Sequence, residues 1–377
     1  ETTSRERLRE LILIAIWRSD WKHELQSQNI SIHNILQEVF TVKLEMSALR
    51  WGIVSAGTVA HDFACAVSTL PEADHRVVAV AARGLENAQK FAELHGIGSF
   101  YDGYEALARD KNVDIVYIGA VTSTHYEVAM AMLDAGKHVL CEKPLCVNEG
   151  QSKALLGYAR ERGLFCMESI WSRFFPSYAH VRERIRRGDL GEIQQITIEQ
   201  GLRISNVERI RMGRLGAGSI LDLGVNTVQL ALWTFQSYPK EIVVTGGVEA
   251  ELKVELRFIN GGVASIRTSG IQDLSNTAVI SGTHGKITLY DFWCPTELTD
   301  LDGTVRSYPL PSSKIECIQK NGEGLRYEVE ECRKRVLAGD VESQTVPHGD
   351  SLAIARVQDA IRKQLGVEEV EDYVFKP

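Results

Sequence analysis

The chain has 377 residues, of which 44% are hydrophobic and 24% are charged, and its formal net charge is −8. This length and composition predict a globular protein of two domains, and because no basic block is present we expect no nucleic-acid partner. No apolar run approaches the roughly 20 residues that cross a bilayer, so we expect no membrane association.

The seven cysteines are scattered along the chain and form no C-x-x-C pair. An odd number of cysteines without paired spacing is not typical of a disulfide framework or of a zinc motif. We therefore expect no bound metal, and a reducing, cytoplasmic location.

Residues 1–46 differ from the rest of the chain and are expected to be an N-terminal extension of unknown role. The stretch LRELILIAIW (8–17) is apolar but short, and three early glutamates argue against a transit peptide: Glu1, Glu6 and Glu10. Two interpretations stay open, namely a surface or disordered extension, or translated upstream sequence before a start at Met46.

Residues 47–168 are predicted to form a doubly wound parallel sheet, which is an α/β fold of the Rossmann type. Short runs of apolar, β-branched residues alternate with helical stretches, and such strands are typical of a sheet buried on both faces. The expected strands are 50–55, 76–82, 114–119, 138–142 and 164–168, and the expected helices are 58–70, 84–96, 124–136 and 148–162.

Residues 169–377 are predicted to form an α+β domain around a mainly antiparallel sheet. The run ELKVELRF (251–258) alternates strictly between apolar and charged residues, which indicates a strand with one covered face. Helices at about 173–188 and 217–236 are expected to supply that cover. A last helical region is expected from about 324 to 365, with a break near Pro347.

The first predicted strand runs through GIVSAGTVA (52–60) into a helix, which is the setting of a dinucleotide-binding turn. The glycine fingerprint is degenerate, because Ser55 stands at its first position and Ala60 at its third. Gly57 keeps the position at which the backbone must approach the phosphates. The residues predicted to hold the cofactor here are Ser55, Gly57, Thr58 and Val59; a plain strand–helix turn is the alternative interpretation.

The second predicted strand ends at Ala82 and Arg83, where enzymes that bind NAD usually place an acid. A guanidinium can instead grip a ribose 2′-phosphate with two hydrogen bonds. We therefore predict NADP as the cofactor, with an ordinary surface arginine as the alternative interpretation of Arg83.

The segment HVLCEKPL (138–145) places Lys143 directly after a predicted strand, and Pro144 prevents that strand from continuing. Ligands of open α/β sheets lie beyond the carboxyl ends of the strands, so Lys143 is expected to face the cleft. An amine there can take a hydroxyl proton as hydride leaves the same carbon, provided that desolvation or a nearby cation lowers its pKa. The alternative is an exposed lysine paired with Glu142.

The stretch AGKHVLCEKPL (135–145) resembles the signature of the Gfo/Idh/MocA family of oxidoreductases. Two further segments resemble family motifs: GAVTSTHYEVAMAMLDAGK (119–137) and LGAGSILDLGVN (215–226). RWGIVSAG, MESIWSRFFP and LSNTAVISGTHGK extend the resemblance, within the family, to dimeric members that oxidise sugars or dihydrodiols. The resemblance covers about Ala48 to Leu365 and implies a Rossmann domain, an open-faced antiparallel sheet and a homodimer formed through that sheet.

The resemblance implies that Lys143 and Asp222 are catalytic. Four residues after Asp222, however, this chain departs from the family motif. The family has Tyr or His at that position, and this chain has Asn226. An amide can orient a substrate hydroxyl but cannot titrate, so Asn226 cannot act as an acid or a base. The structural alternatives are a helix cap for Asp222 and a buried polar contact for Asn226.

The resemblance also implies further residues around the ligands. Thr122, His125 and Glu142 are expected beside the cofactor, with His125 anchoring the loop near the nicotinamide. Trp171, Phe174 and Gln200 are expected beside the substrate, where Gln200 replaces an aromatic residue of the dihydrodiol enzymes. Core packing is the alternative for Trp171, and Trp293 is a further pocket candidate.

Two functional hypotheses follow. The first is an NADP-dependent dehydrogenase that acts on a sugar, such as D-xylose, or on a trans-dihydrodiol, in which Lys143 moves the proton and a water replaces the missing Tyr or His. The second is a catalytically weak NADP-binding homologue that serves as a sensor or dimeric partner. A transferase that needs no NAD(P) is a distant third, because the phosphate turn would then have no role.

Overall fold

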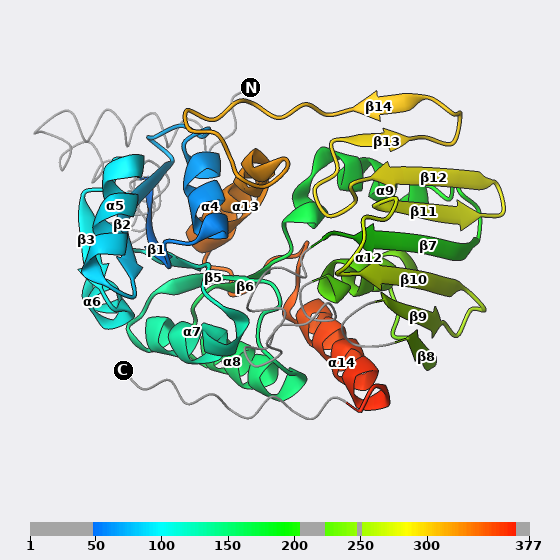
Figure 1. Ribbon diagram of the computed structural model, residues 1–377, viewed down its shortest axis with the longest axis horizontal. Coiled ribbons are helices and arrows are strands. Elements are labelled where there is room, and N and C mark those ends of the chain that lie inside the picture. Colours follow the sequence, from blue (N-terminus) through cyan, green and yellow to red (C-terminus); the bar gives the residue numbers. More distant parts are fainter. Residues whose placement is uncertain (1–47, 204–222, 247–250, 367–377) are drawn as a thin grey trace, which may run out of the picture. The chain divides into compact units, whose positions relative to one another are not determined.

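The computed structural model describes residues 48–203, 223–246 and 251–366, and this part of the chain contains two β-sheets flanked by helices (Figure 1). The predicted N-terminal extension (1–46) and Asp222 lie outside the described residues. None of the described helices is both long and apolar enough to cross a membrane.

The first sheet has six parallel strands in the order β3-β2-β1-β4-β5-β6, so the predicted doubly wound sheet is confirmed. Short β3 and α6 were missed, because β3 alternates half-buried and exposed residues and has no apolar run. The strands are β1 Leu49–Val54, β2 His75–Ala82, β3 Ser99–Asp102, β4 Ile115–Ile118, β5 His138–Glu142 and β6 Cys166–Ser169. The helices are α4 Thr58–Val67, α5 Leu85–His95, α6 Tyr104–Arg109, α7 His125–Asp134 and α8 Glu149–Glu161.

Helices cover both faces of this sheet, and the side chains of β4 show how. Ile115 and Tyr117 point into one apolar cluster, which includes residues of α4 and α5. Val116 and Ile118 point the other way, into a cluster with residues of α7 and α8. Successive side chains of a strand face opposite sides of the sheet, so a continuous apolar run serves both clusters.

The second sheet has eight strands in the order β14-β13-β12-β11-β7-β10-β9-β8. Its pairs are antiparallel except for the parallel pair of β7 and β10, so the predicted mainly antiparallel sheet is confirmed. The strands are β7 Ile193–Gly201, β8 Glu241–Gly246, β9 Glu251–Arg257, β10 Val263–Ser269, β11 Thr277–Gly282, β12 Gly285–Tyr290, β13 Glu297–Thr299 and β14 Val305–Ser307.

Helices α9 (Pro176–Arg186) and α12 (Gly224–Phe235) lie against one face of this sheet (Figure 1). Beneath them the apolar side chains of the alternating run are buried: Leu252, Val254, Leu256 and Phe258. The helix expected from about 173 begins later, after the 3₁₀ turn η2 (Trp171–Phe174). Phe175 is extended because a residue before proline is pushed out of the helical region by the proline ring.

The other face of the second sheet carries charged pairs. Arg257 contacts Glu241 at 3.0 Å and Glu255 at 2.6 Å, and Arg267 contacts Glu251 at 3.0 Å. Exposed pairs of this kind each contribute little to stability, typically ~0.2–1 kcal/mol. Dimerisation through this face stays a prediction.

The C-terminal segment returns to the first sheet through η3 (Gly322–Leu325), α13 (Arg326–Ala338) and α14 (His348–Gln364), and the predicted break at Pro347 is confirmed. Helix α13 packs against α4, and α14 packs against α8. His348 Nε2 lies 2.8 Å from the carbonyl oxygen of Cys166 at the start of β6. The domain division at residue 168 therefore stays a prediction, since the last helices contact the first domain.

We expect His75→Gln to reduce the loss of stability in acid. Burial lowers the pKa of His75, and together with the nearby Arg333 guanidinium it brings that pKa to about 4. The unfolded chain therefore takes up this proton first, and the folded state loses stability as the pH falls from about 6.5 toward 4. This group alone accounts for about 2 kcal/mol between about pH 7.5 and about pH 5.

Urea unfolding of both proteins at the two pH values measures this difference. The wild type should lose about 2 kcal/mol more than His75→Gln, because glutamine cannot take up the proton. An equal loss in the two proteins would contradict the prediction.

Candidate active site

A cleft of about 1040 Å³ lies beyond the carboxyl ends of the parallel strands and is also lined by residues of the second domain. This edge of a doubly wound sheet is where ligands bind. Most of the predicted site residues line it: Ser55, Gly57, Thr58, Val59, Arg83, Thr122, Glu142, Lys143, Trp171, Gln200 and Asn226.

The turn between β1 and α4 forms one wall of the cleft. Ser55 has a φ of 90°, a left-handed conformation that favours glycine, and it occupies the first position of the glycine fingerprint. Its Oγ accepts a hydrogen bond of 3.2 Å from the backbone N–H of Gly57, which caps α4. The turn thus keeps the shape of a phosphate-binding loop although its first glycine is replaced.

Close packing behind the turn also supports the shape of a phosphate-binding loop. A Cβ on Gly119, at the end of β4, would lie 3.1 Å from the Tyr117 ring and 3.2 Å from the Val59 side chain. Ala60, at the third fingerprint position, is fully buried. These small residues let the strands and the N-terminus of α4 approach closely, so the turn fits the pyrophosphate of a dinucleotide.

The predicted ribose position lies at the end of β2. Ala82 is buried and Arg83 is exposed at the edge of the cleft. Two residues of α5, Asn87 and Lys90, also line this part and were not predicted. The Asp102 carboxylate, at the end of β3, accepts a hydrogen bond of 3.0 Å from the backbone N–H of Gly84.

Lys143 follows the last residue of β5, as predicted, and its half-buried side chain lines the cleft. The neighbouring Glu142 side chain is buried, and its Oε2 accepts a hydrogen bond of 3.2 Å from the Lys143 backbone N–H. Burial raises the pKa of Glu142, while Tyr117, Lys143 and Ser169 oppose that rise. Lys143 is therefore held beside a carboxylate that is itself fixed by other residues.

A buried hydrogen-bond network stands behind Glu142. Its Oε1 accepts a hydrogen bond of 2.7 Å from Tyr117, and it lies 3.0 Å from Ser169 Oγ. Ser169 Oγ also lies 2.7 Å from Glu328 Oε1. A hydroxyl has one proton, so it cannot donate to both carboxylates.

Burial favours a proton on the carboxyl group of Glu328 over one on Glu142. It raises the pKa of Glu328 well above its ordinary value, and the nearby charge of Glu142 raises it further. A proton on Glu328 lets this carboxyl group donate to Ser169 Oγ, which can then donate to Glu142 Oε1. The sequence contained no sign of this chain, because Glu142 and Glu328 are far apart in it.

Asn226 and Gln200 lie together in the cleft. Asn226 is in the first turn of α12, Gln200 is on β7, and both are buried. The Asn226 amide donates to Gln200 Oε1 at 3.5 Å. Trp171 and Trp293 line the same cleft. Asn226 and Gln200, two of the positions at which the sequence departs from the family pattern, are therefore in contact.

Two predicted site residues do not line the cleft. Phe174 is half-buried and packs against the apolar cluster that also includes Trp171. His125 is buried, and its two ring nitrogens lie 2.9 Å and 3.1 Å from the carbonyl oxygens of Pro144 and Ala120. His125 thus holds the loop after Lys143, which agrees with the expected anchoring role.

Residues 318–325 complete the cleft and were missed. The Asp62 carboxylate on α4 accepts hydrogen bonds of 2.7 Å and 3.0 Å from the backbone N–H groups of Ile318 and Gln319. Ile318, Gln319, Gly322 and Leu325 all line the cleft. Such a contact between distant segments leaves no local pattern in the sequence.

Comparison with known proteins agrees with this geometry. Residues 49–169 match an oxidoreductase family with an NAD-binding Rossmann fold, and residues 178–288 match the GFO/IDH/MocA C-terminal domain. The chain belongs to the Gfo/Idh/MocA family of oxidoreductases. The family resemblance stated from the sequence is thereby confirmed, and so is its α/β fold.

The curated relatives of this Gfo/Idh/MocA chain include two vertebrate enzymes named trans-1,2-dihydrobenzene-1,2-diol dehydrogenase. The protein from Danio rerio is 38% identical over 332 residues, which cover 86% of this chain and 99% of that protein. The protein from Homo sapiens is also 38% identical, with the same coverage. These relatives support an oxidoreductase that acts on CH–OH groups.

Solved structures show the same architecture. KijD10, a 3-ketoreductase from Actinomadura kijaniata in complex with NADP and TDP-benzene, is 25% identical with a TM-score of 0.72, covering 84% of this chain and 98% of that one. Levoglucosan dehydrogenase in complex with NADH and levoglucosan is 21% identical with a TM-score of 0.74, covering 85% and 98%. The second likeness shows the fold alone.

We expect Glu328→Gln to become more stable than the wild type as the pH rises. The pKa of Glu328 is raised in the folded state, so the folded state binds a proton that the unfolded chain has released above about pH 4.5. The wild type therefore loses about 1.4 kcal/mol per pH unit from this group until the folded pKa is reached. The glutamine amide can donate to Ser169 without that loss.

The measurement is urea unfolding between about pH 5 and about pH 8. Glu330→Gln, at an exposed position of the same helix, is the matched control and should follow the wild type. A Glu328→Gln protein that loses stability in parallel with the wild type would show that Glu328 is ionised in the fold.

Proposed function

We propose that this protein is an NADP-dependent dehydrogenase that oxidises a CH–OH group of a sugar, such as D-xylose, or of a trans-dihydrodiol. The observation that carries the proposal is that one cleft collects the phosphate turn, Lys143 and the Asn226–Gln200 pair. The names of the curated relatives and the NADP in the KijD10 structure support the same reaction class.

Residues of the first domain would hold the cofactor. The turn from Ser55 to Val59 and the free N–H groups of α4 suit the pyrophosphate. Arg83 suits the ribose 2′-phosphate, whereas Lys90 at the same edge of the cleft is paired with Glu86 at 2.6 Å. The Arg83 guanidinium is why we propose NADP over NAD.

Bound NADP⁺ would supply the hydride acceptor. Lys143 takes the proton of the substrate hydroxyl when the C–H bond of the same carbon gives up its hydride, so the alcohol becomes a carbonyl. The buried Glu142 carboxylate holds the lysine in place, and Ser169 and Tyr117 hold Glu142. Each positioned acid–base group of this kind contributes typically ~100- to 10,000-fold to the rate.

The other lining residues indicate the substrate class. Asn226 and Gln200 offer neutral amides that can donate to and accept from several hydroxyl groups. Trp171 and Trp293 offer apolar ring surfaces, which suit the C–H faces of a sugar ring or a cyclic diol. A polar residue at Gln200, where the dihydrodiol enzymes are expected to be aromatic, favours a sugar.

A second candidate function is a catalytically weak NADP-binding homologue. Asn226 favours it, since its amide is already hydrogen-bonded to Gln200 and cannot exchange a proton with the substrate oxygen. The presence of Lys143 at the expected position favours the dehydrogenase.

Turnover assays distinguish the two functions. With NADP⁺ and a panel of D-xylose, D-glucose, inositol and a trans-dihydrodiol, we expect NADPH formation that Lys143→Met lowers at least about 100-fold in kcat. Asn226→Tyr should raise kcat by about 10-fold or more, because it restores a group that can titrate. The measurement is NADPH absorbance.

Lys153→Met, at an exposed position on α8, is the control and should keep full activity. Wild-type protein that binds NADPH tightly but turns over none of these substrates would favour the binding protein. Unchanged turnover in Lys143→Met would contradict the proposed role of the lysine.

Cofactor choice gives an independent prediction. Arg83→Ser should weaken NADPH binding by about 10- to 100-fold, as the loss of a charge-assisted hydrogen bond implies, and should leave NADH binding nearly unchanged. Fluorescence titration with both cofactors measures the ratio. Equal losses for NADPH and NADH would show that Arg83 does not contact the 2′-phosphate.

A further inference from the structure

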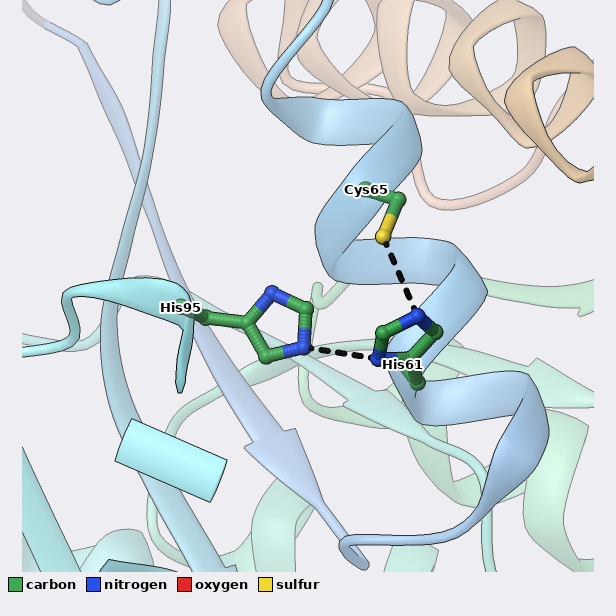
Figure 2. A group of neighbouring side chains, drawn as sticks. All are labelled: His61, Cys65 and His95. Atoms are coloured by element: carbon green, nitrogen blue, oxygen red, sulfur yellow. Dashed lines mark hydrogen bonds between the residues drawn. The ribbon is translucent and has the colours of Figure 1, made fainter. Parts of the chain in front are cut away.

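Three metal-ligating side chains meet between α4 and α5. His61 and Cys65 are four residues apart on α4, so they project from the same face of the helix, and His95 is the last residue of α5. One ligand atom from each residue lies within 4.8 Å of the other two. Figure 2 shows the two imidazoles facing each other, with Cys65 one turn further along α4.

The distances are close to those of a tetrahedral metal site. His95 Nε2 lies 3.1 Å from His61 Nδ1, and Cys65 Sγ lies 3.5 Å from His61 Nε2. Zinc bonds of about 2.0–2.1 Å to nitrogen and about 2.3 Å to sulfur place neighbouring ligand atoms roughly 3.3–3.7 Å apart. The two contacts end on different ring nitrogens of His61, so the His61 ring must turn before one of its nitrogens, Cys65 Sγ and a His95 nitrogen can bind the same ion. One ligand atom of each residue already lies within 4.8 Å of the other two.

The surroundings of His61 resemble those of a metal-binding histidine. Its Nε2 lies 3.0 Å from the backbone carbonyl oxygen of Glu316 and can donate to it. Nδ1 then keeps its lone pair and faces His95. Metal-ligating histidines commonly donate their other N–H to a carbonyl, which fixes the tautomer and the ring orientation.

A second sulfur and an apolar wall adjoin the cluster. The Cys317 thiol is hydrogen-bonded to that of Cys65, so it is available for a fourth ligand position. The Phe91 ring packs against His95 at a centroid distance of 4.5 Å.

We propose that His61, Cys65 and His95 form a zinc site that cross-links α4 and α5, with Cys317 or a water as the fourth ligand. Imidazole and thiolate donors select Zn²⁺ over Mg²⁺ and Ca²⁺, which prefer oxygen. Binding releases the Cys65 proton to solvent as the Zn–S bond forms. The site adjoins the proposed cofactor cleft through His61, but it does not depend on the proposed reaction.

The sequence predicted no metal, because the ligands show no recognisable spacing. His61 and Cys65 form only an i, i+4 pair, and His95 follows on the next helix. Zinc motifs are recognised when ligand pairs recur at short intervals. Only the packing of α4 against α5 brings the third ligand to the pair.

The full chain, freed of metal with a chelator, is titrated with Zn²⁺ and separately with Co²⁺. We expect one equivalent to bind, Tm to rise with Zn²⁺ concentration, and the Co²⁺ protein to show tetrahedral d–d bands with a thiolate charge-transfer band. An absence of binding by the wild type at micromolar Zn²⁺ would overturn the proposal.

Two single variants test the ligands separately. Cys65→Ser should abolish the charge-transfer band, and both Cys65→Ser and His95→Gln should weaken Zn²⁺ binding at least about 10-fold, since each removes a ligand. His284→Gln, at an exposed position outside the cluster, is the control and should bind like the wild type.

Circular dichroism of the metal-free variants checks that they are folded. The two substitutions lie on different helices. If one variant does not fold, the other variant still tests the proposal. Wild-type affinity in a folded variant of either kind would overturn the assignment of that ligand, and wild-type affinity in both would overturn the site.

Discussion

All six strands of the first sheet run parallel, and this constraint places everything that the site needs at one edge. Parallel strands end on the same side, so the turn after β1, Arg83 after β2 and Lys143 after β5 meet although they are up to 88 residues apart in the chain. Buried apolar runs hold the strands between two helical layers. Gln200 on β7 of the second sheet and Asn226 on α12 then complete the cleft.

The buried hydrogen-bond chain behind Lys143 joins the first domain to helix α13. Glu328 on α13 contacts Ser169 at the end of β6, and Ser169 contacts Glu142 beside the lysine. An ionised carboxylate buried without partners is strongly unfavourable, so burial keeps a proton on Glu328 and gives the chain one direction. The return of the C-terminal helices to the first domain is therefore part of the site and not only of the fold.

The structure accounts for three departures from the family pattern, at Ser55, Asn226 and Gln200. Ser55 keeps a left-handed turn without the usual glycine, and its hydroxyl uses the N–H of Gly57. Asn226 and Gln200 replace residues at two positions that prove to be neighbours, so the change at one is matched by a polar residue at the other. The family resemblance stated from the sequence identified both positions, but only the structure shows that they form one pair.

The sequence alone determined the fold class, the turn between β1 and α4 and the position of Lys143, because each depends on local periodicity or on residues next to a strand end. It did not reveal β7 and β8, the placement of Phe174 in the core, the closing segment at residues 318–325, or the Glu328 chain. Those depend on contacts between distant segments, and burial there is decided by packing and not by local pattern. The meeting of His95 with His61 and Cys65 has the same origin, since two helices must pack before their ligands can converge.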